Sequence, residues 1–268
     1  MATRNVALAV VIPTYNEADA ITTLLRPLRE IVTLRPGLQT SVLVVDDNSP
    51  DGTAKVVEEF AAANNDHLFS VEVLHRPRKE GLGRAYVDGL QTVLRKGAPD
   101  FVLQMDADMS HDPAHIPSFL DAAHDAELVV GSRYVAGGAT ADWAWYRRVL
   151  SRVGNAYARA FLGSAISDYT GGFNLFSADL LRRLPLSEMR APGYGFVVEL
   201  KYAALRQARQ VREVPIVFVD RREGGSKIPS STIPRNLLLV PLIRFRRPVM
   251  RPASCPDPPG TGAAAGRP

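Results

Sequence analysis

The sequence has very little cysteine and no long apolar run. Cys255 is the only cysteine among 268 residues, so no disulfide can form within the chain and no cysteine-based metal site is available. The apolar run near the C-terminus, Leu237–Ile243, has seven residues and includes Pro241, whereas a membrane-spanning helix needs roughly 20. These absences exclude a disulfide-stabilised scaffold and predict no transmembrane helix. We expect a cytosolic protein in which Val6–Ile12 forms a first strand and not a signal peptide.

The glycine-rich phosphate-binding loops of common nucleotide-binding folds are also absent. The sequence contains no GxxxxGK[ST], and no GxGxxG follows the first apolar segment. Gly81, Leu82 and Gly83 form a short glycine element, which we interpret as the start of a helix. These absences disfavour P-loop NTPases, kinases and dinucleotide-dependent dehydrogenases.

What the sequence does contain is an alternation of strand and helix signals, in a chain that is 46% hydrophobic and 22% charged. The predicted strands are Val6–Ile12, Ser41–Val45, Phe69–Leu74, Phe101–Met105 and Leu128–Val130. The predicted helices between them are Ala18–Thr33, Thr53–Asn64, Gly83–Leu94 and Pro113–Ala123. This alternation predicts an α/β fold with a mainly parallel sheet and helices on both faces. Ligands of such sheets bind beyond the carboxyl ends of the strands.

Polar clusters follow three of these strands: PTYNE from residue 13, DDNSPDGT from residue 46 and DADMSHD from residue 106. Turn and helix-cap chemistry could explain any one of them. It does not explain Asp106 and Asp108 together, because two neighbouring carboxylates repel each other unless a cation lies between them. No histidine or cysteine spacing suits zinc, and we interpret His111 as a loop residue that does not bind metal. The oxygen ligands therefore indicate Mg²⁺ or Mn²⁺ and a nucleoside diphosphate or triphosphate substrate.

Six motifs in a fixed order carry a resemblance to a known family: VVIPTYNE, VVDDNSPDGT, GLGRAY, MDADMSHDP, GSRY and FVDRREGGSK. They resemble the inverting family 2 glycosyltransferases, and among these the dolichol-phosphate mannosyltransferase or polyprenol monophosphomannose synthase branch, over about residues 6–230. The resemblance implies a GT-A fold with a nucleotide-binding sheet, GDP-mannose as donor and a divalent metal. It also implies a polyprenyl (dolichyl-type) phosphate as acceptor, at the inner, cytoplasmic face of the membrane.

The resemblance also implies roles for individual residues. The donor-binding set is Pro13, Tyr15, Glu17, Val45, Asp47, Asp106, Ala107, Asp108, Arg133, Arg221 and Lys227. The metal set is Asp106, Asp108 and Ser110, with the short Ser110 hydroxyl reaching the ion through water. The acceptor-phosphate set is Arg133, Arg147 and Ser151, although a solvated helix edge is the alternative for the last two. The expected catalytic residues are Asp106, Asp108, Arg221 and Lys227.

Phosphate chemistry agrees with these roles. Cleavage of the bond between sugar and diphosphate builds negative charge on the leaving group, which the metal, Arg221 and Lys227 would stabilise. A phosphate monoester has a second pKa of about 6, so it is already an anionic nucleophile at neutral pH and needs no general base. We expect one in-line displacement with inversion, in which arginines hold two anions together.

Positive charge is concentrated near the C-terminus. Residues 201–268 carry 13 Lys and Arg against 4 Asp and Glu, whereas residues 1–200 carry 19 against 24. Arginines interleave there with the apolar stretch Ile233–Phe245, a mixture that favours an anionic membrane surface over nucleic acid as the partner. A helix packed on the domain with a solvated basic edge is the alternative. We expect a catalytic domain at 1–230, a basic amphipathic membrane-associating segment at 231–247 and a disordered Pro/Gly/Ala-rich tail at 248–268.

Other readings stay open at this point. The donor could be another nucleotide sugar such as UDP-glucose, or the acceptor a hydroxyl group; non-enzymatic alternatives are a nucleotide-sugar binding protein and a nucleic-acid binding protein. Asn174 stands where many relatives have Arg or Lys, which removes one positive charge near the acceptor side and leaves the acceptor's identity less secure. The motif QxxRW is absent, which favours transfer of a single sugar. Trp143, Trp145 and Tyr146 fit either packing against the core or contact with lipid headgroups. Whether a separate membrane anchor subunit is needed is left open.

Overall fold

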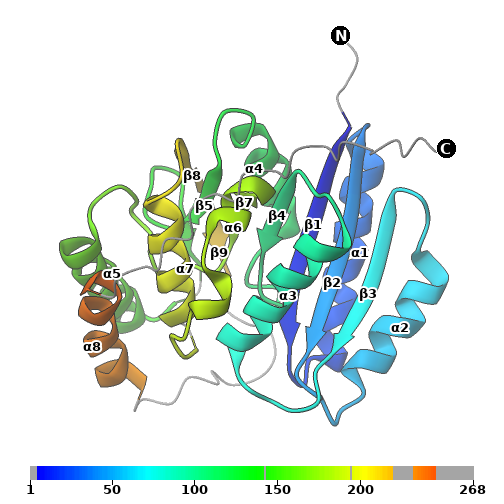
Figure 1. The fold of residues 1–268 in the computed structure, drawn as a ribbon, viewed down its shortest axis with the longest axis horizontal. Coiled ribbons are helices and arrows are strands. Elements are labelled where there is room, and N and C mark those ends of the chain that lie inside the picture. The colour runs from blue at the N-terminus through cyan, green and yellow to red at the C-terminus, as the bar shows by residue number, and fades with distance from the viewer. Residues whose placement is uncertain (1–4, 142, 194, 220–231, 246–268) are drawn as a thin grey trace, which may run out of the picture.

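Seven strands form the central sheet of the described residues, which are 5–141, 143–193, 195–219 and 232–245 of this computed structural model. The strands are β1 (Val6–Thr14), β2 (Leu38–Asp46), β3 (Phe69–His75), β4 (Phe101–Gln104), β5 (Leu128–Ser132), β7 (Asn174–Ser177) and β8 (Val211–Pro215). They lie in the order β3-β2-β1-β4-β7-β5-β8 (Figure 1). Within this sheet β7 runs antiparallel to both its neighbours, and the other pairs are parallel. The predicted α/β fold with a mainly parallel sheet is confirmed.

Helices cover both faces of the sheet because its strands are apolar on both sides. In β1, Leu8, Val10 and Ile12 pack on one helical layer while Ala9 and Val11 pack on the other, as the two-residue period of a strand requires. One layer consists of α1 (Ala18–Leu34), α2 (Thr53–Asn64), the 3₁₀ turn η1 (Pro113–His115) and α4 (Ile116–Ala122). The other consists of α3 (Leu82–Lys96), α5 (Trp145–Leu162), α6 (Ala178–Arg183), the 3₁₀ turn η2 (Leu186–Glu188), α7 (Gly195–Leu205) and α8 (Thr232–Phe245).

The predicted elements match these bounds to within three residues at each end, and α2 has the predicted bounds. Two differences are informative. The predicted helix Pro113–Ala123 divides into η1 and α4, because the chain winds more tightly directly after the proline. Strands β7 and β8 were not predicted. Gly81 is the N-cap of α3, as expected for the glycine element.

The carboxyl ends of β1, β2 and β4 meet at one edge of the sheet, the lower edge in Figure 1. Thr14 is in register with Asp46, and Val11 is in register with Gln104. The three polar clusters therefore come together at this edge, as the parallel arrangement predicts.

Two short parallel strands, β6 (Ala139–Thr140) and β9 (Val217–Phe218), continue the structure beyond β5 and β8. The Ile216 N–H donates to the Ser132 carbonyl and the Ala139 N–H donates to the Ile216 carbonyl, both at 3.0 Å. This pairing places Phe218 beside the loop that begins at Arg133.

The C-terminal segment predicted at 231–247 contains a helix, α8, which contacts α5 and α7. The tail predicted at 248–268 lies outside the described residues. Across the described ranges, no helix has both the length and the apolar character needed to cross a bilayer.

Candidate active site

Asp106 and Asp108 lie in the loop that follows β4. Oδ1 of Asp106 accepts a hydrogen bond of 2.9 Å from the Tyr86 hydroxyl on α3. Oδ1 of Asp108 accepts two hydrogen bonds from Ser110, of 2.6 Å from its hydroxyl and 3.1 Å from its backbone N–H. Met109 has a φ of 61°, and this left-handed conformation turns the chain so that Ser110 reaches back to Asp108. Both carboxylates are half-buried, and a hydroxyl donor orients each of them.

His111 supports this loop from inside the protein. Its ring is fully buried and stacks on Phe173 with 5.0 Å between ring centroids, and its Nδ1 accepts a 3.0 Å hydrogen bond from the Asp106 N–H. Burial lowers the pKa of His111, outweighing the raising effect of Asp106 and Asp108. A neutral ring is also what an accepting Nδ1 requires. His111 is thus a loop residue, as expected, but its role in holding the Asp106 backbone was not predicted.

The oxygen atoms of this loop fit a hard divalent cation. A Cβ atom on Gly172 would lie 3.4 Å from Oδ2 of Asp106, so the glycine keeps the space beside that carboxylate open. No group of three or more His, Cys, Asp or Glu side chains in the described ranges could hold a metal. A cation held by Asp106 and Asp108 would therefore complete its coordination with water and substrate oxygens, as Mg²⁺ commonly does. The Ser110 hydroxyl donates to Asp108, and its role as a water-mediated metal contact stays a prediction.

The residues predicted for the guanosine pocket come together at the ends of β1 and β2. Pro13 is in register with Val45, and the Tyr15 ring lies under the Lys79 ammonium, with 3.4 Å between Nζ and the ring centroid. The Glu17 N–H donates to the Thr53 hydroxyl at 3.0 Å, which ties the start of α1 to the start of α2. The Val45 side chain is fully buried against α3, so a contact to a nucleotide there would come from its backbone.

Asp47 is buried at the start of α3 and is held by an arginine that sequence reasoning missed. Its carboxylate forms an ion pair with Arg76 and accepts a 3.2 Å hydrogen bond from the Gly81 N–H. Arg76 also binds Asp88 and Glu80, at 2.9 and 2.7 Å. Burial alone would lower the pKa of Arg76, but Asp47 and Asp88 raise it, so the cation stays charged. This network of ion pairs holds Asp47 in place at one wall of the predicted guanosine pocket.

On the other side of the site, Arg133 is buried in a two-pronged ion pair with Asp168. Its Nε and Nη2 donate to the two carboxylate oxygens at 2.7 and 2.8 Å, and Nη2 also donates to the Thr170 hydroxyl at 2.8 Å. Burial alone would raise the pKa of Asp168, but Arg133 and Lys201 outweigh it and lower the pKa to about 2. Sequence reasoning placed Arg133 on phosphates; in the structure its charge is already balanced by Asp168.

The loop that contains Asp168 and Thr170 is held by two further side chains. Lys201 of α7 is fully buried, and its Nζ donates to the carbonyl oxygens of Asp168 and Gly171, each at 2.7 Å. Burial lowers the pKa of Lys201 to about 7 against the raising effect of Asp168. From α5, the Asn155 Oδ1 accepts hydrogen bonds from the N–H groups of Tyr169 and Thr170, at 2.8 and 3.3 Å. The same loop continues to Gly172, beside Asp106.

Arg147 and Ser151 lie one turn apart on α5, as predicted. The Ser151 hydroxyl accepts a 2.6 Å hydrogen bond from the hydroxyl of Tyr134, the residue after Arg133. The Arg147 guanidinium lies 4.7 Å from the centroid of the Trp143 ring. The predicted acceptor residues are therefore neighbours of the Arg133 loop.

One aromatic side chain joins the acidic loop to these acceptor residues. The Phe218 ring centroid lies 5.6 Å from that of His111 and 5.4 Å from that of Trp143, and 5.4 Å from the Arg133 guanidinium. His111 in turn contacts the Asp106 backbone. These contacts connect the loop of Asp106 and Asp108, through His111 and Phe218, to Arg133 and to Trp143, which lies beside Arg147. Arg221 and Lys227 lie outside the described residues.

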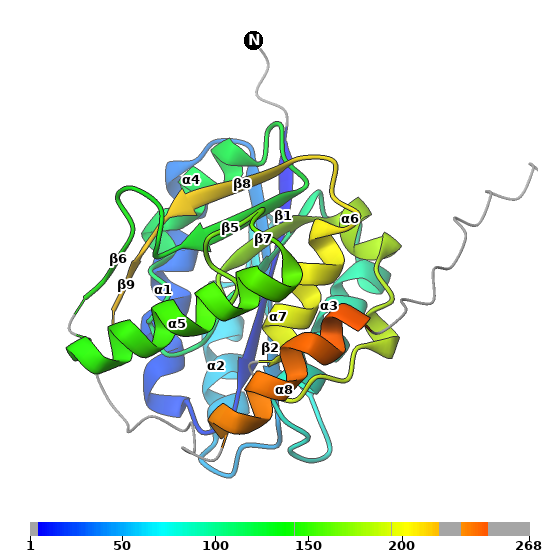
Figure 2. The ribbon, with the colours of Figure 1, turned by 90° about the vertical axis from the view of Figure 1, so that its left-hand side faces the viewer.

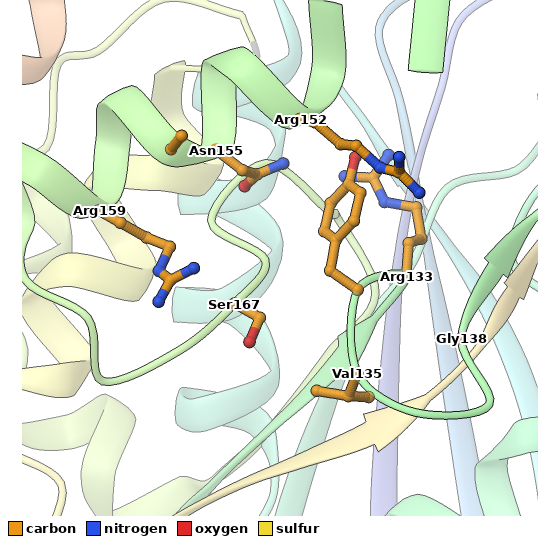
Figure 3. Close-up of a pocket in the computed structure, with 9 residues that line it drawn as sticks. Arg133, Val135, Gly138, Arg152, Asn155, Arg159 and Ser167 are labelled. Atoms are coloured by element: carbon orange, nitrogen blue, oxygen red, sulfur yellow. The ribbon is translucent and has the colours of Figure 1, made fainter. Parts of the chain in front are cut away.

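A pocket of about 360 Å³ opens between the Arg133 loop and α5. Figure 3 shows Arg152, Asn155 and Arg159 on the α5 side, facing the loop that carries Arg133 and Val135. Arg152 and Arg159 line this pocket beside Arg133, whose charge Asp168 balances, so the two α5 arginines favour an anionic ligand.

A mainly parallel α/β sheet with an acidic loop at its carboxyl edge is an architecture for binding phosphate-linked ligands with a cation. The comparison with known families is specific: the model of glycosyl transferase family 2 matches residues 9–184. The chain belongs to this family and is a glycosyltransferase.

Two curated relatives are similar over most of their length. Undecaprenyl-phosphate mannosyltransferase of Micrococcus luteus is 40% identical over 223 residues, which cover 83% of this chain and 88% of the relative. Polyprenol monophosphomannose synthase of Mycolicibacterium smegmatis is 40% identical over 225 residues, which cover 84% of this chain and 82% of the relative. The resemblance seen in the six motifs is confirmed.

Solved structures confirm the GT-A fold. Glucosyl-3-phosphoglycerate synthase from Mycobacterium tuberculosis, crystallised with Mn²⁺, UDP-glucose and phosphoglyceric acid, matches with a TM-score of 0.60 and 21% identity, covering 89% of this chain and 79% of that one. Mannosyl-3-phosphoglycerate synthase from Rubrobacter xylanophilus matches with a TM-score of 0.61 and 18% identity, covering 89% and 73%. At these identities the similarity concerns the fold.

Proposed function

We infer that the chain transfers one mannose from GDP-mannose to a polyprenyl phosphate, with inversion at the sugar. The observation that carries the proposal is the 40% identity to two enzymes named for mannose and polyprenyl phosphates. The contacts that connect the acidic loop, through His111 and Phe218, to Arg133 support it. An anionic acceptor explains why the predicted acceptor side has arginines and hydroxyls.

On the donor side, Asp106 and Asp108 would hold a divalent cation, Mg²⁺ or Mn²⁺, which when bound would neutralise charge on the donor diphosphate. The protein's own contribution is orientation. Tyr86 and Ser110 fix the two carboxylates, and His111 fixes the backbone between them. Pro13, Tyr15, Glu17, Val45 and Asp47 would surround the guanosine, with Ala107 close to the sugar. The similar structure of glucosyl-3-phosphoglycerate synthase was crystallised with Mn²⁺, which supports a divalent metal.

On the acceptor side, Arg147 and Ser151 would hold the lipid phosphate, and Arg133 would shape the loop around it. Because the fork of Arg133 is occupied by Asp168, its main effect is to fix the position of Tyr134, whose hydroxyl orients Ser151. The acceptor phosphate is anionic at neutral pH, since its second pKa is about 6, and so requires no general base. Arg221 and Lys227 would stabilise the leaving diphosphate.

The proposal includes a location and a division of the chain. A lipid-linked acceptor requires the enzyme to work at a membrane surface, and we propose the inner face of the cytoplasmic membrane. Residues 1–230 would form the catalytic domain, 231–247 a membrane-associating segment and 248–268 a tail. A separate membrane anchor subunit is the alternative way to reach the lipid. Nucleic acid is not a proposed partner.

The test supplies labelled GDP-mannose, GDP-glucose, UDP-glucose and UDP-galactose separately to the purified chain with a polyprenyl phosphate and Mg²⁺. We expect label in the lipid extract only with GDP-mannose, and none with the Asp106→Asn, Asp108→Asn variant. Transfer only from a uridine donor would refute the donor assignment. Label on a sugar polymer or on a simple alcohol would refute the acceptor assignment.

A further inference from the structure

The loop at residues 168–173 contacts both halves of the site. At its start, the Asp168 carboxylate binds the Arg133 guanidinium through both oxygens, at 2.7 and 2.8 Å. Near its end lies Gly172, where an added Cβ atom would be only 3.4 Å from Oδ2 of Asp106. A shift of this loop would therefore change how the acidic loop and the Arg133 loop lie relative to each other.

The helix α7 supplies a lysine that reaches this loop from inside the protein. Figure 2 shows α7 between α5 and α3 in their helical layer, and Figure 1 shows the same order. Lys201 of α7 is fully buried, and its Nζ donates to the carbonyl oxygens of Asp168 and Gly171, each at 2.7 Å. The Asp168 carboxylate accepts the Gly171 N–H at 2.9 Å. The ammonium thus joins two carbonyls three residues apart and closes the turn between them.

Stability alone does not account for a lysine at this position. Burial lowers the pKa of Lys201 to about 7 against the raising effect of Asp168, while Arg133 lowers this pKa further and Glu213 raises it. Replacing a buried ionic group by an apolar side chain of similar volume is often neutral or stabilising. Groups with strongly shifted pKa values are also concentrated at functional sites. The buried amine therefore indicates a role in the site.

We propose that Lys201 is a positioning residue of the transfer reaction, whose ammonium holds the 168–173 loop so that the acidic loop and α5 stay aligned. This inference rests on the proposed function. The loop meets α5 through Asn155, whose Oδ1 accepts the N–H groups of Tyr169 and Thr170. Because α5 also carries the predicted acceptor residues, the loop connects them to Asp106. A misplacement of about 1 Å between reacting groups can lower a rate on the order of 10²-fold.

The protonation of Lys201 should move stability and activity in opposite directions. Above pH 7 the folded chain loses the proton that the unfolded chain keeps up to about pH 10.5, so the unfolding free energy rises. Over the same range the loop loses charge-assisted hydrogen bonds, which are stronger than neutral ones, so kcat should fall. A lysine that only stabilised the fold would not make kcat fall while the protein becomes more stable.

The other charged groups around Lys201 do not produce this pattern. Asp168 has a pKa of about 2 and stays ionised. Burial alone would lower the pKa of Arg133, but Asp168 raises it, so this cation also keeps its charge. Glu213 of β8 binds the N–H groups of Ser167 and Asp168. Burial lowers the pKa of His111, so its ring is already neutral where Lys201 titrates.

The test compares Lys201→Met with the wild type in mannosyl transfer at pH 6.5 and 8.5. At pH 6.5 we expect kcat of the variant to be about tenfold lower or more, with both KM values within about twofold, because the groups that bind each substrate are unchanged. Its kcat should not fall above pH 7. The fold should survive, since the Gly171 carbonyl keeps a donor in Asn174 Nδ2 at 3.2 Å. Thr40→Val, which replaces a buried polar side chain of β2, is the matched control and should retain the wild-type kcat and pH profile.

Hydrogen exchange measured without substrate separates this inference from the proposed function. Peptides covering residues 168–173 should exchange faster in Lys201→Met than in the wild type, and peptides of β1 and β2 should exchange equally. Unchanged exchange in the loop, or a variant with wild-type kcat at pH 6.5, would overturn the positioning role. So would a wild type whose kcat and unfolding free energy rise together between pH 7 and 9, a result that needs no variant. If no nucleotide sugar supports transfer to lipid, the proposed function fails, and the exchange rates still decide whether Lys201 holds the loop.

Discussion

The two halves of the site use charge in opposite ways. In the donor half, Asp106 and Asp108 are half-buried and are oriented by the neutral hydroxyls of Tyr86 and Ser110. In the acceptor half, Arg133 and Asp168 are both buried and neutralise each other, with Lys201 behind them. Hydroxyl donors thus hold the half-buried acidic pair, on which we propose a cation, whereas the predicted acceptor half uses a buried ion pair to hold a loop.

Removing the acidic pair should give the largest effect on activity. We expect Asp106→Asn, Asp108→Asn to reduce mannosyl transfer on the order of 10³-fold or more, because the groups that would hold the cation are lost where charge develops. The fold should survive, since both side chains are half-buried and Asn can keep accepting from Tyr86 and Ser110. Transfer to lipid and the thermal midpoint measure the two properties. Asp112→Asn, at the cap of η1, is the control; a double variant with wild-type turnover in the presence of a chelator would show that no cation works there.

Removing the buried acid should instead act on stability. In Asp168→Asn the Arg133 guanidinium would lose its anionic partner while remaining buried, which should cost about 3 kcal/mol or more of unfolding free energy. Asp125→Asn breaks an exposed pair with Arg212 and should cost less than about 1 kcal/mol. Urea unfolding compares the two variants. Equal losses would mean that the buried pair is no more important than a surface pair.

The pH dependence of the unfolding free energy should reveal the lowered pKa of Lys201. Its folded-state pKa of about 7 lies below the ordinary value of 10.5, so between these two pH values the unfolded chain binds more protons than the folded one. Lys201 therefore makes the unfolding free energy rise as pH increases from about 7 to about 10.5, and contributes no pH dependence below that window. Lys201→Met should remove this rise. Parallel urea unfolding series for wild type and variant measure it; identical slopes would show that the buried amine keeps its ordinary pKa.

The smallest expected effect concerns the hydroxyl pair at the edge of α5. Tyr134→Phe removes the donor to Ser151, and Ser151→Ala removes a predicted phosphate contact. We expect each to raise the KM for the polyprenyl phosphate about five- to tenfold, as loss of one hydrogen bond worth about 1 kcal/mol implies, with the KM for the nucleotide sugar unchanged. Initial-rate kinetics at varied acceptor concentration check this. A change confined to the KM for the nucleotide sugar would contradict the assignment of these hydroxyls to the acceptor.

The sequence predicted the donor half better than the acceptor half, for a physical reason. Asp106 and Asp108 follow a clear strand and stand two residues apart, so their repulsion and their position at the sheet edge were both visible. The partners Arg133 and Asp168 are 35 residues apart, and only the fold reveals that they meet. Tyr86 and Tyr134 stood inside recognised motifs but received no role.

The strands that were missed lie in the same half. The strand β7 is only four residues long and lies antiparallel between β4 and β5. The alternation of strand and helix signals that predicted the parallel strands therefore does not predict it. Its first residue, Asn174, is buried and donates to Gln104 at 3.0 Å, a polar contact inside the sheet that periodicity does not predict. Lys201 was also missed, although a lysine in the largely apolar helix α7 suggests a buried polar partner.

The helix α5 has eighteen residues and is a single rigid element, and its two sides have different neighbours. One side carries Ser151 and Asn155, which contact Tyr134 and the Thr170 loop; the other carries an exposed apolar stripe that includes Trp145, Val149 and Val153. Because both sides belong to one helix, whatever covers the outer stripe would also fix the position of Ser151 and Asn155, without an intervening hinge.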